Sequence, residues 1–322
     1  MPKLPSRLSR LLACAAVALP LVTHASEDIP DQYPQSPLYS KPVEVIPHVW
    51  SAIGATAPPT YENAGHNNNL SFILTGAGVV VVNGGASAQL AEALHAEIRT
   101  ITDQPVVLVI NENGQGHAML GNSYWRDQGV EILAHADAAH EFEEYGPQIL
   151  EGMKRYNRDR AEGTRLVAPD RTFDEREVIE LGDVRVEVLH LGPAHSPGDI
   201  QVWLPNWDIV IAGDMAFHER MPPIFADTVT SEWVETWETA FEPLGATYVI
   251  PGHGHPTNMA QVRRYTRDYL VYLRGQIRAH IDAGGDLSEA YYVDQSPYAH
   301  LDTYEELATK NAGRVYEEME WE

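Results

Sequence analysis

The chain has 322 residues, of which 44% are hydrophobic and 21% are charged, with 46 Asp+Glu against 22 Lys+Arg and a formal charge of −24. This composition is typical of a folded protein with a sizeable core and excludes a disordered chain. The acidic excess argues against a nucleic-acid-binding surface, because such a surface needs cationic side chains to neutralise phosphates.

The first 25 residues have the pattern of a secretory signal peptide. Positive charges within residues 3–10 precede a largely apolar run from Leu11 to Val22, and Ala25 provides a small residue for cleavage. The apolar run is too short to span a membrane as a helix. We therefore expect export to the periplasm or the medium, with no membrane attachment after cleavage. Cleavage would also remove Cys14, the only Cys, and with it any disulfide or thiolate metal ligand. Residues 11–14 resemble a lipoprotein cleavage site, but Arg10 leaves no apolar stretch before them.

Residues 26–42 are polar and rich in proline, which predicts an extended leader, and ordered structure is expected to start at Val43. Two short runs rich in β-branched residues, Leu70–Thr75 and Gly78–Val82, predict paired strands. Ser87–Thr100 has apolar residues at helical spacing, with Ser87 as the N-cap.

The remaining elements predict alternating helices and strands, and then a helical tail. Val106–Ile110 predicts a strand buried on both faces, because it is continuously apolar. The later elements are a short helix to about Asp127, a strand near Glu131–Ala134, a helix over 136–161, strands at Glu177–Leu181, Val184–Leu189, Ile200–Leu204 and Ile209–Ala212, a helix near 231–241, a strand at Thr247–Ile250 and helices from about Asn258. This order predicts one α/β sandwich domain over 43–257 and a helical extension over 258–322.

Four loops that follow predicted strands carry His, Asp or amide side chains. They are Asn111–His117 (NENGQGH), Gly192–Asp199 (GPAHSPGD), Ala212–Asp214 (AGD) and Pro251–His255 (PGHGH). Polar groups can converge at strand ends without interrupting a sheet. Imidazoles together with a carboxylate, on a chain left without Cys, suit a borderline metal such as zinc. The Asn-rich segment Tyr61–Asn69 could form a loop over such a pocket.

The segments GPAHSPGD, AGD and PGHG, in this order and at these spacings, resemble the third, fourth and fifth sequence motifs of the metallo-β-lactamase superfamily. The resemblance covers most of Val43 to about Thr257. It implies an α/β fold, the αββα sandwich of that superfamily, with the metal site at one edge. Val82–Gly85 occupies the place of the usual Asp-Thr-Gly turn, and the tail segment Asn311–Tyr316 is similar to periplasmic members linked with quinoprotein or sulfur metabolism.

The second motif departs from the family pattern His-x-His-x-Asp-His. Alignment without a gap places Asn113 and Gln115 at the first two His positions, His117 at the Asp position and Ala118 at the last His position. A one-residue shift would instead place His117 at the last His position.

On the first alignment, the resemblance implies that the three-His site keeps only His195, beside two amides. The second site would then consist of His117, Asp214 and His253. Amide oxygens bind zinc weakly, so one zinc ion is expected, held by these three side chains with an open position; manganese or iron is an alternative.

Such a metal would lower the pKa of a bound water and supply a nucleophile. His195 could ligate weakly, act as a general base or orient the substrate, and Asn113 and Gln115 could hydrogen-bond the substrate or the attacking water.

The resemblance therefore implies an exported metal-dependent hydrolase that acts on a small ester, thioester, lactone or lactam. The replacement of both leading His residues argues against an efficient β-lactamase. The alternative is a periplasmic binding or accessory protein that kept the fold and lost turnover. The fold does not select a substrate, and the sequence does not determine the oligomeric state.

Overall fold

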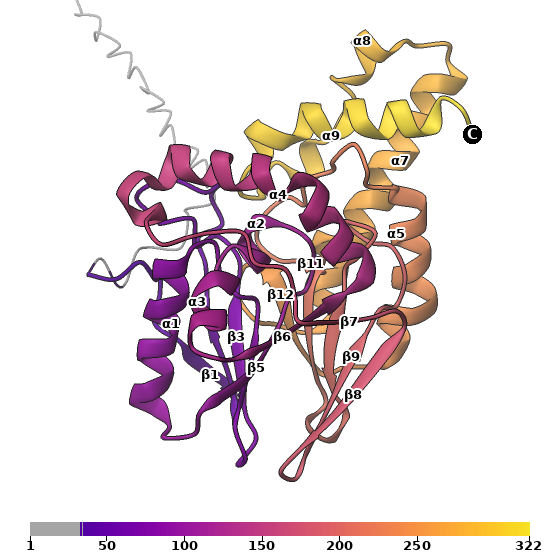
Figure 1. Ribbon diagram of the computed structural model, residues 1–322. Coiled ribbons are helices and arrows are strands. Elements are labelled where there is room, and N and C mark those ends of the chain that lie inside the picture. Colours follow the sequence, from indigo (N-terminus) through magenta and orange to yellow (C-terminus); the bar gives the residue numbers. More distant parts are fainter. Residues whose placement is uncertain (1–32, 34) are drawn as a thin grey trace, which may run out of the picture.

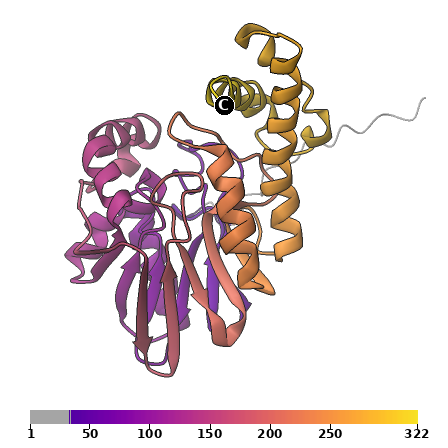
Figure 2. The ribbon, with the colours of Figure 1, turned by 90° about the vertical axis from the view of Figure 1, so that its right-hand side faces the viewer.

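The computed structural model describes residue 33 and residues 35–322, so the expected signal peptide lies outside the described residues. Two sheets face each other, and helices cover both outer faces (Figures 1 and 2). The predicted αββα sandwich with C-terminal helices is thus confirmed. Among the described residues, no helix is both long and apolar enough to cross a membrane.

The first sheet has seven strands in chain order. They are β1 (Val43–Ile46), β2 (Val49–Ala52), β3 (Leu70–Leu74), β4 (Val79–Val82), β5 (Val106–Ile110), β6 (Glu131–His135) and β7 (Arg171–Phe173). The first four strands pair antiparallel, and β4 to β7 pair parallel. β4 shows why this sheet is buried on both faces: Val80 and Val82 pack between the sheets, whereas Val79 and Val81 pack under the helices.

The second sheet has five strands, and its spatial order is β12-β11-β10-β9-β8. The bounds are β8 (Arg176–Leu181), β9 (Val184–Leu189), β10 (Gln201–Leu204), β11 (Ile209–Phe217) and β12 (Tyr248–His253). β11 and β12 run parallel, and the other neighbours run antiparallel.

The helices fall into two groups, one on each outer face. The first group is α1 (Ala88–Ile101), α2 (Gly116–Met119), α3 (Asn122–Asp127) and α4 (Ala136–Asn157). The second group is α5 (Thr230–Thr236), α6 (Met259–Tyr265), α7 (Arg267–Asp282), α8 (Leu287–Ala290) and α9 (Tyr304–Met319). α1 begins as predicted, because the Ser87 hydroxyl accepts from the Leu90 amide at 3.2 Å.

Two expectations need correction. Packed structure begins before Val43, since Leu38 and Tyr39 are already buried in the core. The strands predicted over Ile209–Ala212 and Thr247–Ile250 continue to Phe217 and His253. Asp214 and His253 therefore lie inside β11 and β12 and not in loops after them. The register of the β11–β12 pairing shifts on both sides of Gly213. This irregularity lets β11 continue through the AGD motif.

The C-terminal helices share a core with the second sheet. Leu273 of α7 and Val315 of α9 belong to the same buried cluster as Val210 of β11. α4 and α9, which are far apart in the sequence, lie at the same end of the sandwich (Figures 1 and 2).

Candidate metal site and its pocket

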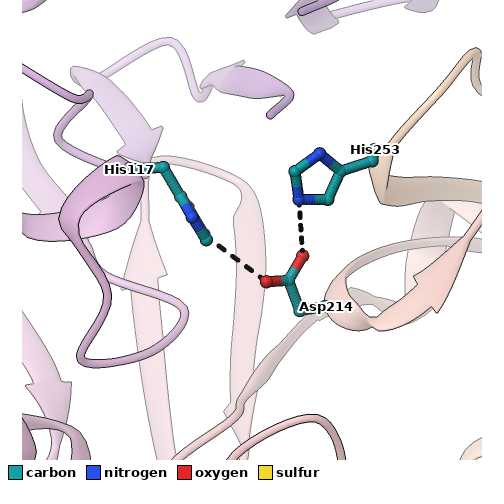
Figure 3. Close-up of side chains that lie close together, drawn as sticks. All are labelled: His117, Asp214 and His253. Atoms are coloured by element: carbon teal, nitrogen blue, oxygen red, sulfur yellow. Dashed lines mark ion pairs between the residues drawn. The ribbon is translucent and has the colours of Figure 1, made fainter. Parts of the chain in front are cut away.

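Three side chains from separate elements converge at this end of the sandwich. His117 comes from α2, Asp214 from β11 and His253 from the last position of β12. One ligand atom of each lies within 4.8 Å of the others. Nε2 of His253 is 3.2 Å from Oδ1 of Asp214, and Nε2 of His117 is 3.6 Å from its Oδ2 (Figure 3). The predicted set of His117, Asp214 and His253 is therefore brought together by the fold.

Two glycines make this approach of β11 and β12 possible. A Cβ on Gly252 would lie 2.2 Å from Oδ1 of Asp214. Gly213 has a positive φ of 57°, and a Cβ there would lie 2.2 Å from Oε2 of Glu112. The AGD and PGHG motifs thus need glycine beside the ligand-type residue, because any side chain would push the carboxylates out of the site.

The imidazole of His253 is held at Nδ1 and presents Nε2 to Asp214. Nδ1 contacts both the carbonyl oxygen of Asn67, which accepts, and Nη1 of Arg220, which donates. Burial and the guanidinium of Arg220, 3.2 Å away, lower the pKa of His253 to about 4, so the ring is neutral at pH 7.

A neutral imidazole has a lone pair on one ring nitrogen, and this lone pair can bind a metal. Nε2 of His253 lies 3.2 Å from Oδ1 of Asp214, so both atoms can face one cation. Together with His117, they give two imidazoles and one carboxylate, a donor set that fits zinc.

His117 lies between two buried carboxylates. Its Nε2 is 2.9 Å from Oε1 of Glu112 and 3.6 Å from Asp214. Burial lowers the pKa of His117, but the two carboxylates outweigh it and raise the pKa overall. Burial and the charge of Asp214 raise the pKa of Glu112, whereas the surrounding imidazoles outweigh burial and lower the pKa of Asp214. A metal would replace the proton of His117 and relieve the repulsion between the carboxylates.

Glu112 was not among the predicted site residues. It belongs to the loop that directly follows the buried strand β5, and this position was the signal that could have singled it out.

The fold also places the three residues that were predicted to act beside the metal, Asn113, Gln115 and His195, next to the converging side chains. Asn113 donates to Oδ2 of Asp214 at 3.3 Å and accepts from the backbone amide of Gln115 at 3.0 Å. The amide nitrogen of Gln115 is 3.0 Å from Nδ1 of His195, which lies 3.7 Å from Oδ2 of Asp214. Both polar atoms of the Asn113 side chain make hydrogen bonds, and the bond to Oδ2 holds Asp214 in place.

The loop that carries His195 is fixed by a buried turn. The side chain of Asp199 accepts from the backbone amide of Ser196 at 2.7 Å and from its hydroxyl at 3.0 Å. The His195 ring packs against Phe225 and Trp233, with centroids 4.9 and 5.7 Å away. Burial lowers the pKa of His195, which is therefore neutral at pH 7.

Ala118, the neighbour of His117, is fully buried among apolar side chains of α2 and α4, outside the converging group. Both alignments of the second motif are compatible with this placement, because each one puts His117 in the site.

A cavity of about 480 Å³ opens onto these residues. Gly65 and Asn67 line it, which confirms that the Tyr61–Asn69 segment forms a loop at the pocket. Side chains of α4 and of the C-terminal helix α9 also line it. The contribution of α9 was not predicted, because nothing in its sequence links it to motifs far away in the chain.

The sequence comparisons point to one superfamily. The sequence model described as "Metallo-beta-lactamase superfamily" matches residues 119–253 and so begins after the divergent second motif. A metallo-beta-lactamase type 2 of Bacteroides fragilis is 23% identical over 168 residues, which cover 51% of this chain and 57% of the relative. A linear primary-alkylsulfatase of a Pseudomonas species is 23% identical over 239 residues, covering 62% and 44%. The chain thus spans about half the length of these curated relatives.

Solved structures share the fold at low identity. A metallo-beta-lactamase from Pontibacter korlensis superposes with a TM-score of 0.59 at 20% identity, covering 72% of this chain and 98% of the other. A stereoselective inverting sec-alkylsulfatase from a Pseudomonas species gives 0.67 at 19% identity, covering 87% and 50%.

Proposed function

Because the chain belongs to the metallo-beta-lactamase superfamily, we propose that it is a metal-dependent hydrolase in which His117, Asp214 and His253 hold one zinc ion. The observation that carries this proposal is the convergence of His117, Asp214 and His253, whose ligand atoms all lie within 4.8 Å of one another. Manganese or iron would accept the same donors.

Zinc, when bound, would lower the pKa of a water molecule and so supply a nucleophile. The chain's own residues then have separate roles. The amide nitrogen of Gln115 can only donate, so Nδ1 of His195 accepts and Nε2 carries the ring proton. Within the described residues this Nε2 has no partner, so we assign it to donate to an oxygen of the substrate, where negative charge develops during hydrolysis. Asn113 keeps Asp214 oriented.

The proposed substrates are small esters, thioesters, lactones and lactams. The two named relatives are a β-lactamase and an alkylsulfatase, so lactams and alkyl sulfates belong in the substrate screen. On the first alignment of the second motif, Asn113 and Gln115 take the places of zinc-binding imidazoles, which argues against an efficient lactamase.

Export is part of this proposal. Residues 1–25 carry the charge and hydropathy pattern of a signal peptide. Mass spectrometry of the chain isolated from the periplasm or the medium should find Ser26 at its N-terminus, whereas a full-length cytoplasmic chain would contradict export.

A second candidate is a binding or accessory protein without turnover. The observation in its favour is that both polar atoms of the Asn113 side chain are already engaged. This reading predicts a ligand-binding pocket but no hydrolysis of any substrate class.

Elemental analysis of the chain, purified without chelators or a metal-affinity column, separates these candidates. We expect about one zinc per chain and a melting temperature that rises with micromolar zinc, since a ligand of the native state stabilises it. Turnover in the screen should vanish on chelation and return with zinc. Two zinc ions per chain would overturn the single site, and no metal after incubation with zinc, manganese and iron would favour the binding protein.

A further inference from the structure

Two helices from distant parts of the chain wall the cavity above the proposed metal site. The residues used below are Ile149, Gly152 and Met153 of α4, and Glu306, Leu307 and Lys310 of α9. In each helix these positions are one, three or four residues apart, so a single face of each helix lines the cavity. The apolar residues of these two faces, Ile149, Gly152, Met153 and Leu307, line a slot that has no role in the proposed hydrolysis.

Gly152 keeps this slot open. It lies inside α4, where glycine is less favourable than alanine by roughly 1 kcal/mol. A Cβ at this position would meet no atom within 4 Å, so no neighbour requires a glycine for packing. A larger side chain would project into the cavity, and the missing side chain therefore corresponds to space for a ligand.

Lys310 places a cation at the edge of the same slot. It is exposed, and it forms no ion pair or hydrogen bond with any residue that the structure describes. Arg314, one turn later on α9, is paired with Glu317 at 2.9 Å. Lys310 therefore offers a positive charge to an anionic group at the edge of the apolar slot.

Glu306 lines the same wall one turn before Lys310. The wall thus carries both signs of charge, and a negatively charged group is favoured only at the Lys310 end. The direction of the change therefore tests the proposal. Removal of the Lys310 charge should weaken the binding of an anion, and removal of the Glu306 charge should strengthen it.

We propose that the substrate is an amphipathic molecule whose apolar body lies between α4 and α9, against Gly152 and Leu307, and whose anionic end pairs with Lys310. The anionic end is remote from the bond that is cleaved, because Lys310 belongs to the wall and not to the metal site. This inference rests on the proposed function only in calling the bound molecule a substrate. The slot would bind the same class of molecule even if the chain catalysed no reaction.

Binding to the full chain, stripped of metal, tests the slot independently of catalysis. The probes are 8-anilinonaphthalene-1-sulfonate and its neutral relative N-phenyl-1-naphthylamine, which share the aromatic body and differ in the sulfonate. We expect Lys310→Met to weaken the binding of the anionic probe roughly fivefold and to leave the binding of the neutral probe unchanged. Glu306→Gln should bind the anionic probe more tightly, because it removes a negative charge from the same wall. The anion site would be overturned if Lys310→Met changed the affinity for both probes equally. It would also be overturned if Glu306→Gln weakened the binding of the anionic probe.

Gly152→Leu should weaken the binding of both probes, because the leucine side chain fills the slot. Gly275→Leu is the matched control: Gly275 is also inside a helix, a Cβ there also meets nothing, and it lies outside the cavity lining. Equal binding by the two leucine variants would show that the probes bind elsewhere and would overturn the slot.

Turnover with zinc then separates this inference from the proposed function. Mono-4-nitrophenyl glutarate and 4-nitrophenyl butanoate carry the same leaving group, and only the first has a remote carboxylate. A lower KM for the glutarate, lost in Lys310→Met, supports both proposals. Hydrolysis of both esters with equal KM overturns the anion site alone. No hydrolysis of any substrate, with probe binding as expected, overturns the hydrolase and leaves the slot.

Discussion

Glu112 places its Oε1 atom 2.9 Å from Nε2 of His117, the same ring nitrogen that lies 3.6 Å from Oδ2 of Asp214. The buried carboxylate of Glu112 therefore adds a negative charge beside the proposed metal site, and this charge favours the binding of a divalent cation. Glu112 precedes His117 by five residues, whereas the three proposed ligands come from separate elements.

Glu112→Gln should retain the shape of the loop and lose the negative charge. We expect metal retention to weaken by about tenfold, measured as the chelator concentration that removes half of the zinc. Glu141→Gln is the control: burial raises the pKa of Glu141 to about 7, and this carboxylate makes no ion pair with His117 within the described residues. Equal chelator sensitivity of the two variants would remove Glu112 from the metal site.

Asp214→Ala and His253→Ala should each abolish metal retention, because each removes one of the three proposed ligands. Zinc content per chain after dialysis measures this loss. His255→Ala should keep its zinc, since His255 is partly exposed and pairs with Glu219 at 2.8 Å. Unchanged zinc content in either of the first two variants would disprove the proposed ligand set.

His195→Ala should reduce turnover far more than metal content. The reason is that its Nε2–H is assigned to the developing negative charge of the substrate, and the loss of one such donor typically lowers kcat by about a hundredfold. Steady-state kinetics on the best ester of the screen, with zinc content measured in parallel, test this role. A proportional loss of zinc and turnover would instead make His195 a primary ligand.

His66 should make the protein less stable in mild acid. It is fully buried, its Nδ1 accepts from the Tyr39 amide at 2.9 Å, and burial lowers its pKa to about 4. The folded state therefore favours the neutral ring, and the unfolded chain binds a proton first, below about pH 6.5. The stabilisation is complete above this pH and is lost as the pH falls towards 4.

For His66 this corresponds to a loss on the order of 2 kcal/mol between pH 7 and pH 5. Urea unfolding of metal-free protein at both pH values measures it, and His66→Gln should show the smaller difference because glutamine does not titrate. The same pH dependence in both proteins would mean that other groups cause it.

The sequence by itself indicated most of the secondary structure and the candidate site residues. Local signals carry the secondary structure: the apolar runs of β3 to β5 and the Ser87 cap of α1 depend mainly on neighbouring residues, whereas β1, β2 and β7 were not predicted. His117, Asp214 and His253 could be selected because their motifs resemble those of the metallo-β-lactamase superfamily, and the fold brings the three side chains together.

Only the tertiary structure decided how these side chains are supported and what surrounds them. The carbonyl of Asn67 fixes the His253 ring across 186 positions of sequence, and α9 supplies Lys310 to a pocket whose opposite wall is α4. The length of β11 was misjudged for the same reason, since its last residues are ordered by pairing with β12. Such contacts arise from the packing of distant elements, and no local pattern in the sequence encodes them.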